Sequence, residues 1–493
     1  MIKRSSIFVF ILTFLAQIVY ADFDFNTNCV NAYNNILSLK LNLARTQINA
    51  EKKRNPENAI PYLLDNYLDY FTFFVSGTEA DFEQLKANKS FRLSRIEKES
   101  PESPYYLYAQ AEINMQNALV RSRFNEYLAS AIEIGRAFKQ LEENSKRFPD
   151  FLPNQKNLGM IHAVLGSVPE GLKRALSAFG IRVNAAKGIR MFEDLIVKLP
   201  KSAYSHYYEE SVFYLAHIRS DILHDPATYN KILENTSVFD SESLLRTYIR
   251  AYAGVKMGHT REAIAELDKR PSGTVYPPYP DLDYLEGLAK IHTLDLSAST
   301  NFIAFLKNYR GVNFIKDAYL NLAWLELLKG NNRGYQSFIN QLKRQGYSYH
   351  DRDKQAINEA NDPMPNLSLL KIRLLFDGAY YDKALAQITD LKLSDFLILR
   401  DKIEYLYRMG RIYDELSKDN LALKYYQAAL DLGKNERYYF ASTAALKMGG
   451  IYEKRRDIQK AKLYFNTAID MKGHDYESSV ENRAKQGLKR IEK

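Results

Sequence analysis

The sequence predicts an all-α fold: a solenoid of helical hairpins preceded by a less regular helical N-terminal half. Apolar residues recur at spacings of three and four along nearly the whole chain of 493 residues, with no clear period-two alternation. Glycine and proline interrupt this pattern at intervals that leave segments about as long as one hairpin. Near the C-terminus, two such segments repeat the same kinds of side chain at the same offsets.

The repeat lies within residues 403–470. Its two copies match with a constant displacement of 39 residues: Gly410, Tyr413, Ala422, Tyr426 and Ala429 in the first, and Gly449, Tyr452, Ala461, Phe465 and Ala468 in the second. We expect the small residues where two helices approach closely and the aromatic ones where gaps between hairpins are filled. The pattern resembles the tetratricopeptide repeat (TPR), and this resemblance implies stacked helix pairs whose first helices line a concave surface.

Weaker copies precede this pair, because a turn glycine is again followed by a small residue of the second helix: Gly258 with Ala263, and Gly378 with Ala384. Residues 319–342 form another expected hairpin, turning at Gly330. We therefore assign residues 236–493 to a TPR-like array of five to seven degenerate repeats. Residues 477–491 are expected to form a polar helix that caps its end.

Residues 22–235 are expected to form the irregular helical N-terminal domain. Long helices are predicted around residues 105–119 and 124–146, followed by a glycine-containing apolar stretch that ends at Pro169. This order loosely resembles the Iml-type outer-membrane TPR family over roughly residues 105–200. The resemblance implies kinship of fold and not a shared function.

Residues 1–21 carry the pattern of a secretory signal peptide. Lys3 and Arg4 precede an apolar run over residues 7–18, and small residues lead to Ala21. We expect cleavage after Ala21 and an exported protein, periplasmic or associated with an outer membrane if the host is bacterial. The alternative is a membrane anchor, for which the run is shorter than the roughly 20 residues that a spanning helix needs.

Composition and motifs argue against several function classes. The formal charge of +9 is mild for this length and no dense Lys/Arg run occurs, so we expect no nucleic-acid partner. We expect no enzyme and no cofactor, because the common catalytic and phosphate-binding motifs are absent. His217, Asp221 and His224 could share one helix face, but solvated polar residues explain them better than a metal site.

The TPR template places a partner-binding strip on the concave surface. With Gly410 and Gly449 at the same repeat position, this strip would present Arg373, Tyr407, Arg408, Arg411 and Lys447. Such a basic strip fits a protein or peptide partner through an acidic segment or a C-terminal carboxylate. The asparagines of the carboxylate clamp found in chaperone-binding TPR proteins are absent here.

The sequence therefore predicts an exported scaffold that binds another protein through a concave groove. One alternative is a SusD-like glycan-binding accessory protein, which a lipobox and exposed loop aromatics would favour. The other is a helical enzyme whose site is assembled from distant residues. Perturbed carboxylates and histidines that converge in one deep pocket would favour that enzyme.

Overall fold

A computed structural model describes residues 23–167, 177, 180–223 and 228–492. These residues form helices and no strand, which confirms the predicted all-α class. The predicted signal peptide, Pro169 and His224 lie outside the described residues. Within the described part, no helix combines the length and the hydropathy needed to cross a bilayer.

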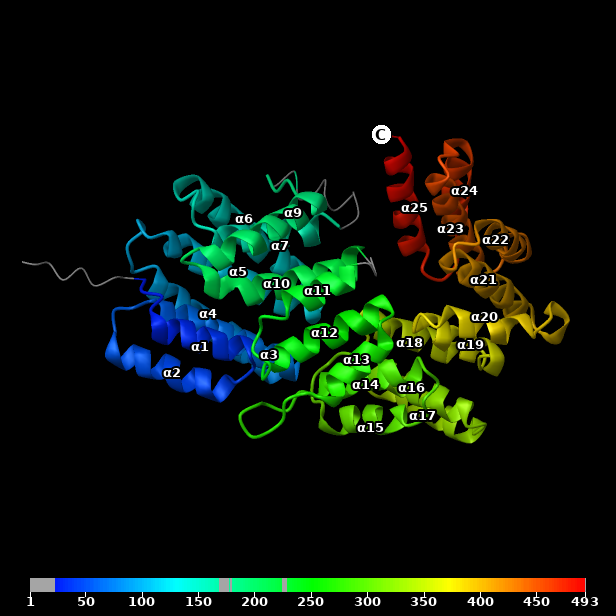
Figure 1. The fold of residues 1–493 in the computed structure, drawn as a ribbon, viewed down its shortest axis with the longest axis horizontal. Helices are drawn as coiled ribbons and strands as arrows, with labels where there is room; N and C mark the ends of the chain where they lie inside the picture. Colours follow the sequence, from blue (N-terminus) through cyan, green and yellow to red (C-terminus); the bar gives the residue numbers. More distant parts are fainter. Residues whose placement is uncertain (1–22, 168–176, 178–179, 224–227, 493) are drawn as a thin grey trace, which may run out of the picture.

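The N-terminal helices form one block, coloured blue to green in Figure 1. They are α1 (Thr27–Leu37), α2 (Leu41–Arg54), α3 (Ile60–Ser76), α4 (Glu79–Ile96), α5 (Pro104–Arg123), α6 (Tyr127–Arg147), α7 (Pro153–Leu165), α9 (Ala185–Lys198), α10 (Tyr208–Ile218) and α11 (Tyr229–Asn235). The expected close packing of short helices occurs between α7 and α9: a Cβ atom at Gly159 would lie 3.1 Å from the ring of Phe192.

Residues 244–470, all of them described, form six helical hairpins and one additional helix. The hairpins are α12 (Leu244–Met257) with α13 (Thr260–Asp268), α14 (Pro280–Ile291) with α15 (Ala298–Asn308), α16 (Ile315–Leu328) with α17 (Asn332–Arg344), α19 (Leu367–Asp377) with α20 (Tyr381–Thr389), α21 (Leu399–Glu415) with α22 (Asp419–Gly433), and α23 (Phe440–Lys454) with α24 (Ile458–Asp470). Helix α18 (Asp351–Asn361) is inserted before the fourth hairpin, and α25 (Glu477–Ile491) follows the last. This architecture is a TPR-like α-solenoid.

The glycines of the repeat lie where the two helices of a hairpin touch. A Cβ atom on Gly410 would be 2.5 Å from Tyr426 Cδ1, and one on Gly449 would be 2.5 Å from Phe465 Cδ1. Tyr426 and Phe465 are buried, together with the alanines at the other matched positions: Ala422, Ala429, Ala461 and Ala468. The two hairpins are therefore packed in the same way.

The remaining matched pair, Tyr413 and Tyr452, differs from the expectation that these aromatic side chains fill the gap between hairpins. Both are only half-buried. Tyr413 stacks on Tyr425 with ring centroids 5.6 Å apart, and Tyr452 stacks on Tyr464 at 5.5 Å. Each pair joins the two helices of one hairpin, so these tyrosines stabilise their own hairpin.

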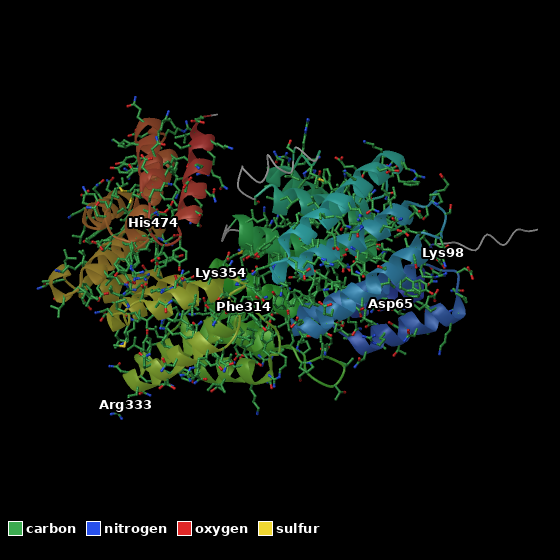
Figure 2. All side chains as sticks on the ribbon, turned by 180° about the vertical axis from the view of Figure 1, so that it is seen from behind. Asp65, Lys98, Phe314, Arg333, Lys354 and His474 are labelled. Atoms are coloured by element: carbon green, nitrogen blue, oxygen red, sulfur yellow. The ribbon has the colours of Figure 1, made fainter. Side chains whose placement is uncertain are left out.

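Helix α25 continues the stack as an additional first helix. A Cβ atom on Gly487 would lie 2.5 Å from Phe465 Cζ, so α25 packs against the far side of the ring that Gly449 also contacts. His474 lies in the connection that leads into α25, and Arg333 on α17 projects from the outer edge of the array (Figure 2).

The array curls until turns distant in sequence meet. The Thr260 hydroxyl donates a hydrogen bond of 3.2 Å to the carbonyl oxygen of Gly378, which joins the α12–α13 turn to the α19–α20 turn. The Tyr309 side chain, after α15, packs against Gly77 after α3. The largest apolar core runs from Cys29 to Leu285 and so includes residues on both sides of the boundary predicted at residues 235/236. That boundary stays a prediction.

Candidate functional site

The curled array forms an open cavity of about 550 Å³ on its concave side. Residues of α12, α14, α16, α18, α19, α20, α21, α23 and α25 line it. Its lining contains six cationic side chains and three carboxylates: Lys256, Arg352, Arg373, Arg411, Lys447 and Arg483, against Asp317, Asp377 and Glu415. Trp324, Phe376 and Tyr381 add aromatic surface. We call this cavity the groove.

Half of the groove's cations are paired with carboxylates. Arg373 donates two hydrogen bonds of 2.8 Å to Glu359, and its guanidinium lies 4.7 Å from the centre of the Trp324 ring. Arg352 lies 3.7 Å from Asp317. Lys256 Nζ lies 3.1 Å from a carboxylate oxygen of Asp221. These three cations are neutralised within the protein and hold neighbouring helices together.

The other three cations, Arg411, Lys447 and Arg483, form no ion pair with any carboxylate of the described residues. They come from α21, α23 and α25, which stand next to each other at the C-terminal end of the groove. Arg411 is held in place, because its Nη1 donates a 2.9 Å hydrogen bond to the hydroxyl of Tyr407 and its guanidinium lies 4.5 Å from the centre of the Phe376 ring. We call these three side chains the cation cluster.

Burial and repulsion act on two members of the cation cluster. The pKa of Lys447 is lowered to about 8, mainly by burial and then by the charge of Arg411, against the opposing effect of Asp414 and Glu415. The pKa of Arg483 is likewise lowered, first by burial and then by Arg411. The pKa of Arg411 itself is raised, because Tyr407, Tyr426 and Glu415 outweigh its burial. A bound anion would relieve the repulsion on Lys447 and Arg483.

The structure brings three of the five predicted partner-binding residues to the groove: Arg373, Arg411 and Lys447. Tyr407 is buried and supports Arg411. Arg408, expected on the concave surface, is buried too, and its Nε donates a 2.7 Å hydrogen bond to Glu404 one helical turn earlier. The expected exposure of these two side chains is therefore corrected, because both lie inside the helix packing.

Arg483 was missed in the sequence because residues 477–491 were interpreted only as a polar cap. Gly487, 38 residues after Gly449, is the signal that could have revealed it. This glycine contacts Phe465, so α25 stands where the first helix of a further repeat would stand. The groove-facing side of that helix then contributes to the binding surface as the earlier first helices do.

A second cluster of charged residues lies inside the N-terminal block, where Lys156, Glu112 and Glu210 are fully buried. Lys156 Nζ lies 3.0 Å from Glu112 Oε2 and 2.6 Å from Glu210 Oε2, and it bonds the Tyr67 hydroxyl at 2.8 Å. Burial raises the pKa of Glu210, opposed by Lys156. Because these groups are closed off from solvent and join α5, α7 and α10, we interpret them as a structural network.

The histidine set proposed from sequence is only partly described. His217 Nδ1 lies 3.6 Å from Asp221 Oδ2, and Asp221 also accepts a 2.7 Å hydrogen bond from Tyr252. Among the described residues, no group of three or more His, Cys, Asp or Glu side chains has an arrangement that could hold a metal ion.

Comparisons with known proteins find similarities in structure. The chain aligns over 92% of its length with 87% of a chain in the crystal structure of the APC/C hetero-tetramer Cut9–Hcn1, at 10% identity and a TM-score of 0.27. It aligns over 94% of its length with 97% of yeast Tom70, at 12% identity and a TM-score of 0.23. No protein-family model and no curated protein matches the chain. At these TM-scores the alignments carry no argument about function, so the TPR-like description rests on the helices of this chain.

Proposed function

We propose that this protein is a scaffold that binds a carboxylate-bearing segment of a partner protein in the groove. The observation that carries the proposal is the cation cluster, in which Arg411, Lys447 and Arg483 converge without an ion pair among the described residues. Glu415 of the same lining offsets part of the charge of Arg411 and Lys447. The remaining positive charge at this end of the concave surface attracts an acidic peptide or a C-terminal carboxylate. The aromatic surface of Trp324 and Phe376 farther along the groove supplies contact area for the rest of that segment.

A binding role is favoured over catalysis because of where the perturbed groups lie. The densest set of carboxylates, lysine and tyrosines surrounds Lys156 and is fully buried, so a substrate has no access to it. The groove, which is open, offers fixed cations and aromatic side chains. We also propose, from residues 3–21 alone, that the protein is exported. The Iml-type resemblance stays a hypothesis about fold kinship.

The test uses three short fluorescent peptides of equal length. One is rich in glutamate with an amidated C-terminus, one is neutral with a free C-terminal carboxylate, and one is neutral and amidated. Fluorescence polarisation at low and at raised salt measures binding. We expect the third peptide to bind weakest, and raised salt to weaken the better of the other two by about tenfold. Equal, salt-independent binding of all three would contradict the proposal, and the ranking of the first two distinguishes an acidic segment from a chain terminus.

A further inference from the structure

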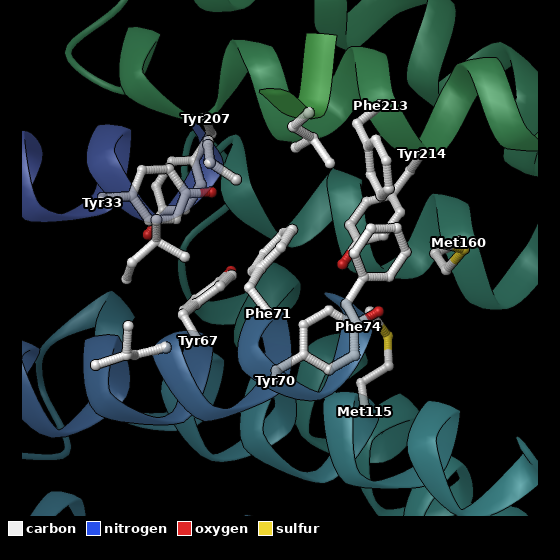
Figure 3. Close-up of a cluster of buried hydrophobic side chains, with 14 of the residues drawn as sticks. Tyr33, Tyr67, Tyr70, Phe71, Phe74, Met115, Met160, Tyr207, Phe213 and Tyr214 are labelled. Atoms are coloured by element: carbon white, nitrogen blue, oxygen red, sulfur yellow. The ribbon is translucent and has the colours of Figure 1, made fainter. Parts of the chain in front are cut away.

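A second cavity, of about 470 Å³, lies in the N-terminal block and is distinct from the groove. Side chains of α3, α5, α7, α10 and the π-helical turn η3 (Arg219–Leu223) line it, together with Ser167. Figure 3 shows five of the lining residues, Tyr70, Phe74, Phe213, Tyr214 and Met160, turned toward one another. The volume falls within the range of about 300–1,000 Å³ that is typical of small-molecule sites. We call this cavity the aromatic pocket.

The aromatic pocket contains one cation without an acidic partner. Arg123, the last residue of α5, lines it with its guanidinium 5.9 Å from the centre of the Phe74 ring. It forms no ion pair with any carboxylate in the described part of the chain. Asp281 is a carboxylate whose charge raises the pKa of Arg123, and it lies outside the pocket lining. Burial in turn raises the pKa of Asp281 to about 7. Tyr248, Tyr309 and Asp281 favour the charged form of Arg123 and raise the pKa of Arg123, but no carboxylate of the described pocket lining forms an ion pair with it.

Two further polar atoms of the lining are poorly satisfied among the described residues. Nε2 of His217 has no hydrogen-bond partner, and the buried hydroxyl of Tyr214 has none apart from the neighbouring Tyr70 hydroxyl. Because burying a polar group without its hydrogen bonds is unfavourable, such groups mark places where a ligand or water is bound. Burial raises the pKa of Tyr70 to about 12 and that of Tyr214 well above its usual value. Both phenols therefore stay protonated and can donate hydrogen bonds at neutral pH.

We propose that the aromatic pocket binds a small aromatic monocarboxylate. Its ring would pack between the walls formed by Phe74, Phe213 and Met160. Its carboxylate would lie toward Arg123 and accept hydrogen bonds from the hydroxyls of Tyr70 and Tyr214. This arrangement gives one ligand group both an ion pair with Arg123 and hydrogen bonds from the two neighbouring phenols, while aromatic rings offer the edge and face contacts that such walls favour.

The charges around the aromatic pocket select a monoanion. Arg123 is the single cation of its described lining, and Asp221 stands at the same lining. Asp221 is engaged by Lys256 at 3.1 Å and by the Tyr252 hydroxyl at 2.7 Å, so its own charge is already balanced. A phosphate or a dicarboxylate would bring a second negative charge with no cation to receive it. A neutral aromatic compound would leave Arg123 uncompensated and bind more weakly.

The test is titration calorimetry on the full chain with 3-phenylpropionate and with its uncharged amide, 3-phenylpropionamide. Arg123→Met removes the cation at similar length. Val164→Trp introduces a large ring from the partly exposed rim of the aromatic pocket, and Val197→Trp on α9 is the matched control, because Val197 is 68% exposed and lines no described pocket. Circular dichroism verifies that each variant is folded. The glutamate-rich peptide should bind the groove equally well in all of them, which separates this proposal from the proposed function.

We expect saturable binding of the acid, at least tenfold weaker binding of the amide, and at least tenfold weaker binding of the acid to Arg123→Met and to Val164→Trp. Val197→Trp should bind like the unmodified protein. The proposal is overturned if the acid shows no saturable binding, if the amide binds equally well, or if a folded Arg123→Met or Val164→Trp variant retains full affinity. If a variant fails to fold, the acid–amide comparison on the unmodified protein still decides the matter.

Discussion

The predicted packing of the repeat can be tested by replacing either of two adjacent glycines, Gly449 or Gly450, by alanine and comparing the stability of the two variants. Both lie in α23. A Cβ atom at Gly449 would be 2.5 Å from Phe465 Cδ1 and 2.6 Å from Cε1, whereas one at Gly450 would meet nothing within 4 Å. Replacing either glycine by alanine raises helix propensity by the same amount, about 0.8–1.0 kcal/mol. The difference between the two variants therefore isolates the contact with Phe465.

The expected difference follows from the surroundings of the Phe465 ring. The ring is 1% exposed and is also bounded by Gly487 of α25, so it cannot move away from a new methyl group without displacing that helix. Overpacking of this kind costs about 1–3 kcal/mol. We expect Gly450→Ala to be about 1 kcal/mol more stable than the unmodified protein, and Gly449→Ala to be less stable than Gly450→Ala by about 1–3 kcal/mol.

Urea denaturation followed by circular dichroism measures the stability of both variants. Because repeat arrays need not unfold in one step, hydrogen exchange of the α23 and α24 amides provides the local value. Equal stability of the two alanine variants, by both measurements, would refute the placement of Gly449 at the helix contact and with it the repeat alignment.

Three other predictions concern different parts of the chain. Lys156→Met should destabilise the protein by about 3–5 kcal/mol in urea denaturation, because it leaves Glu112 and Glu210 buried without their cation, and adding Glu210→Gln should restore part of the loss. Affinity for the glutamate-rich peptide should be constant between about pH 6 and pH 8, where its glutamates are ionised, and fall above pH 8, because the lowered pKa of Lys447 is about 8 in the free protein and the peptide favours its protonated form. Lys447→Met should remove that pH dependence. If the affinity of this variant still declines above pH 8, a group other than Lys447 causes the decline. Mass spectrometry of the exported protein should find Asp22 at the N-terminus, whereas an intact Met1 in a membrane fraction would indicate an anchor.

Local pattern predicted the features that depend on neighbours along the chain. The helix class, the hairpins and the contacts of Gly410 and Gly449 follow from spacings within about 40 residues. They could be predicted because the same pattern of residues occurs twice in the sequence. The same logic failed for Arg408, because the template marks a helix face without showing that Glu404, one turn away, holds this side chain inside the packing.

Features that join distant segments could not be predicted. The network around Lys156 combines residues more than 40 positions apart on three helices, and no periodicity links them. The meeting of Thr260 with Gly378 depends on the small rotations between successive hairpins, which accumulate over 118 residues. These accumulated rotations curve the array, and the curvature determines the size of the groove and places Arg483 near Lys447.

Charge reversal within the cation cluster tests the central claim most directly. Lys447→Glu combined with Arg483→Glu changes two groove cations that form no ion pair among the described residues, so the fold should be retained. The matched control is Lys434→Glu with Lys462→Glu, which changes the net charge equally at two exposed positions outside the groove. We predict that polarisation titration with the glutamate-rich peptide shows at least about tenfold weaker binding for the groove variant and less than about twofold change for the control. Equal affinities of the two variants would contradict the account.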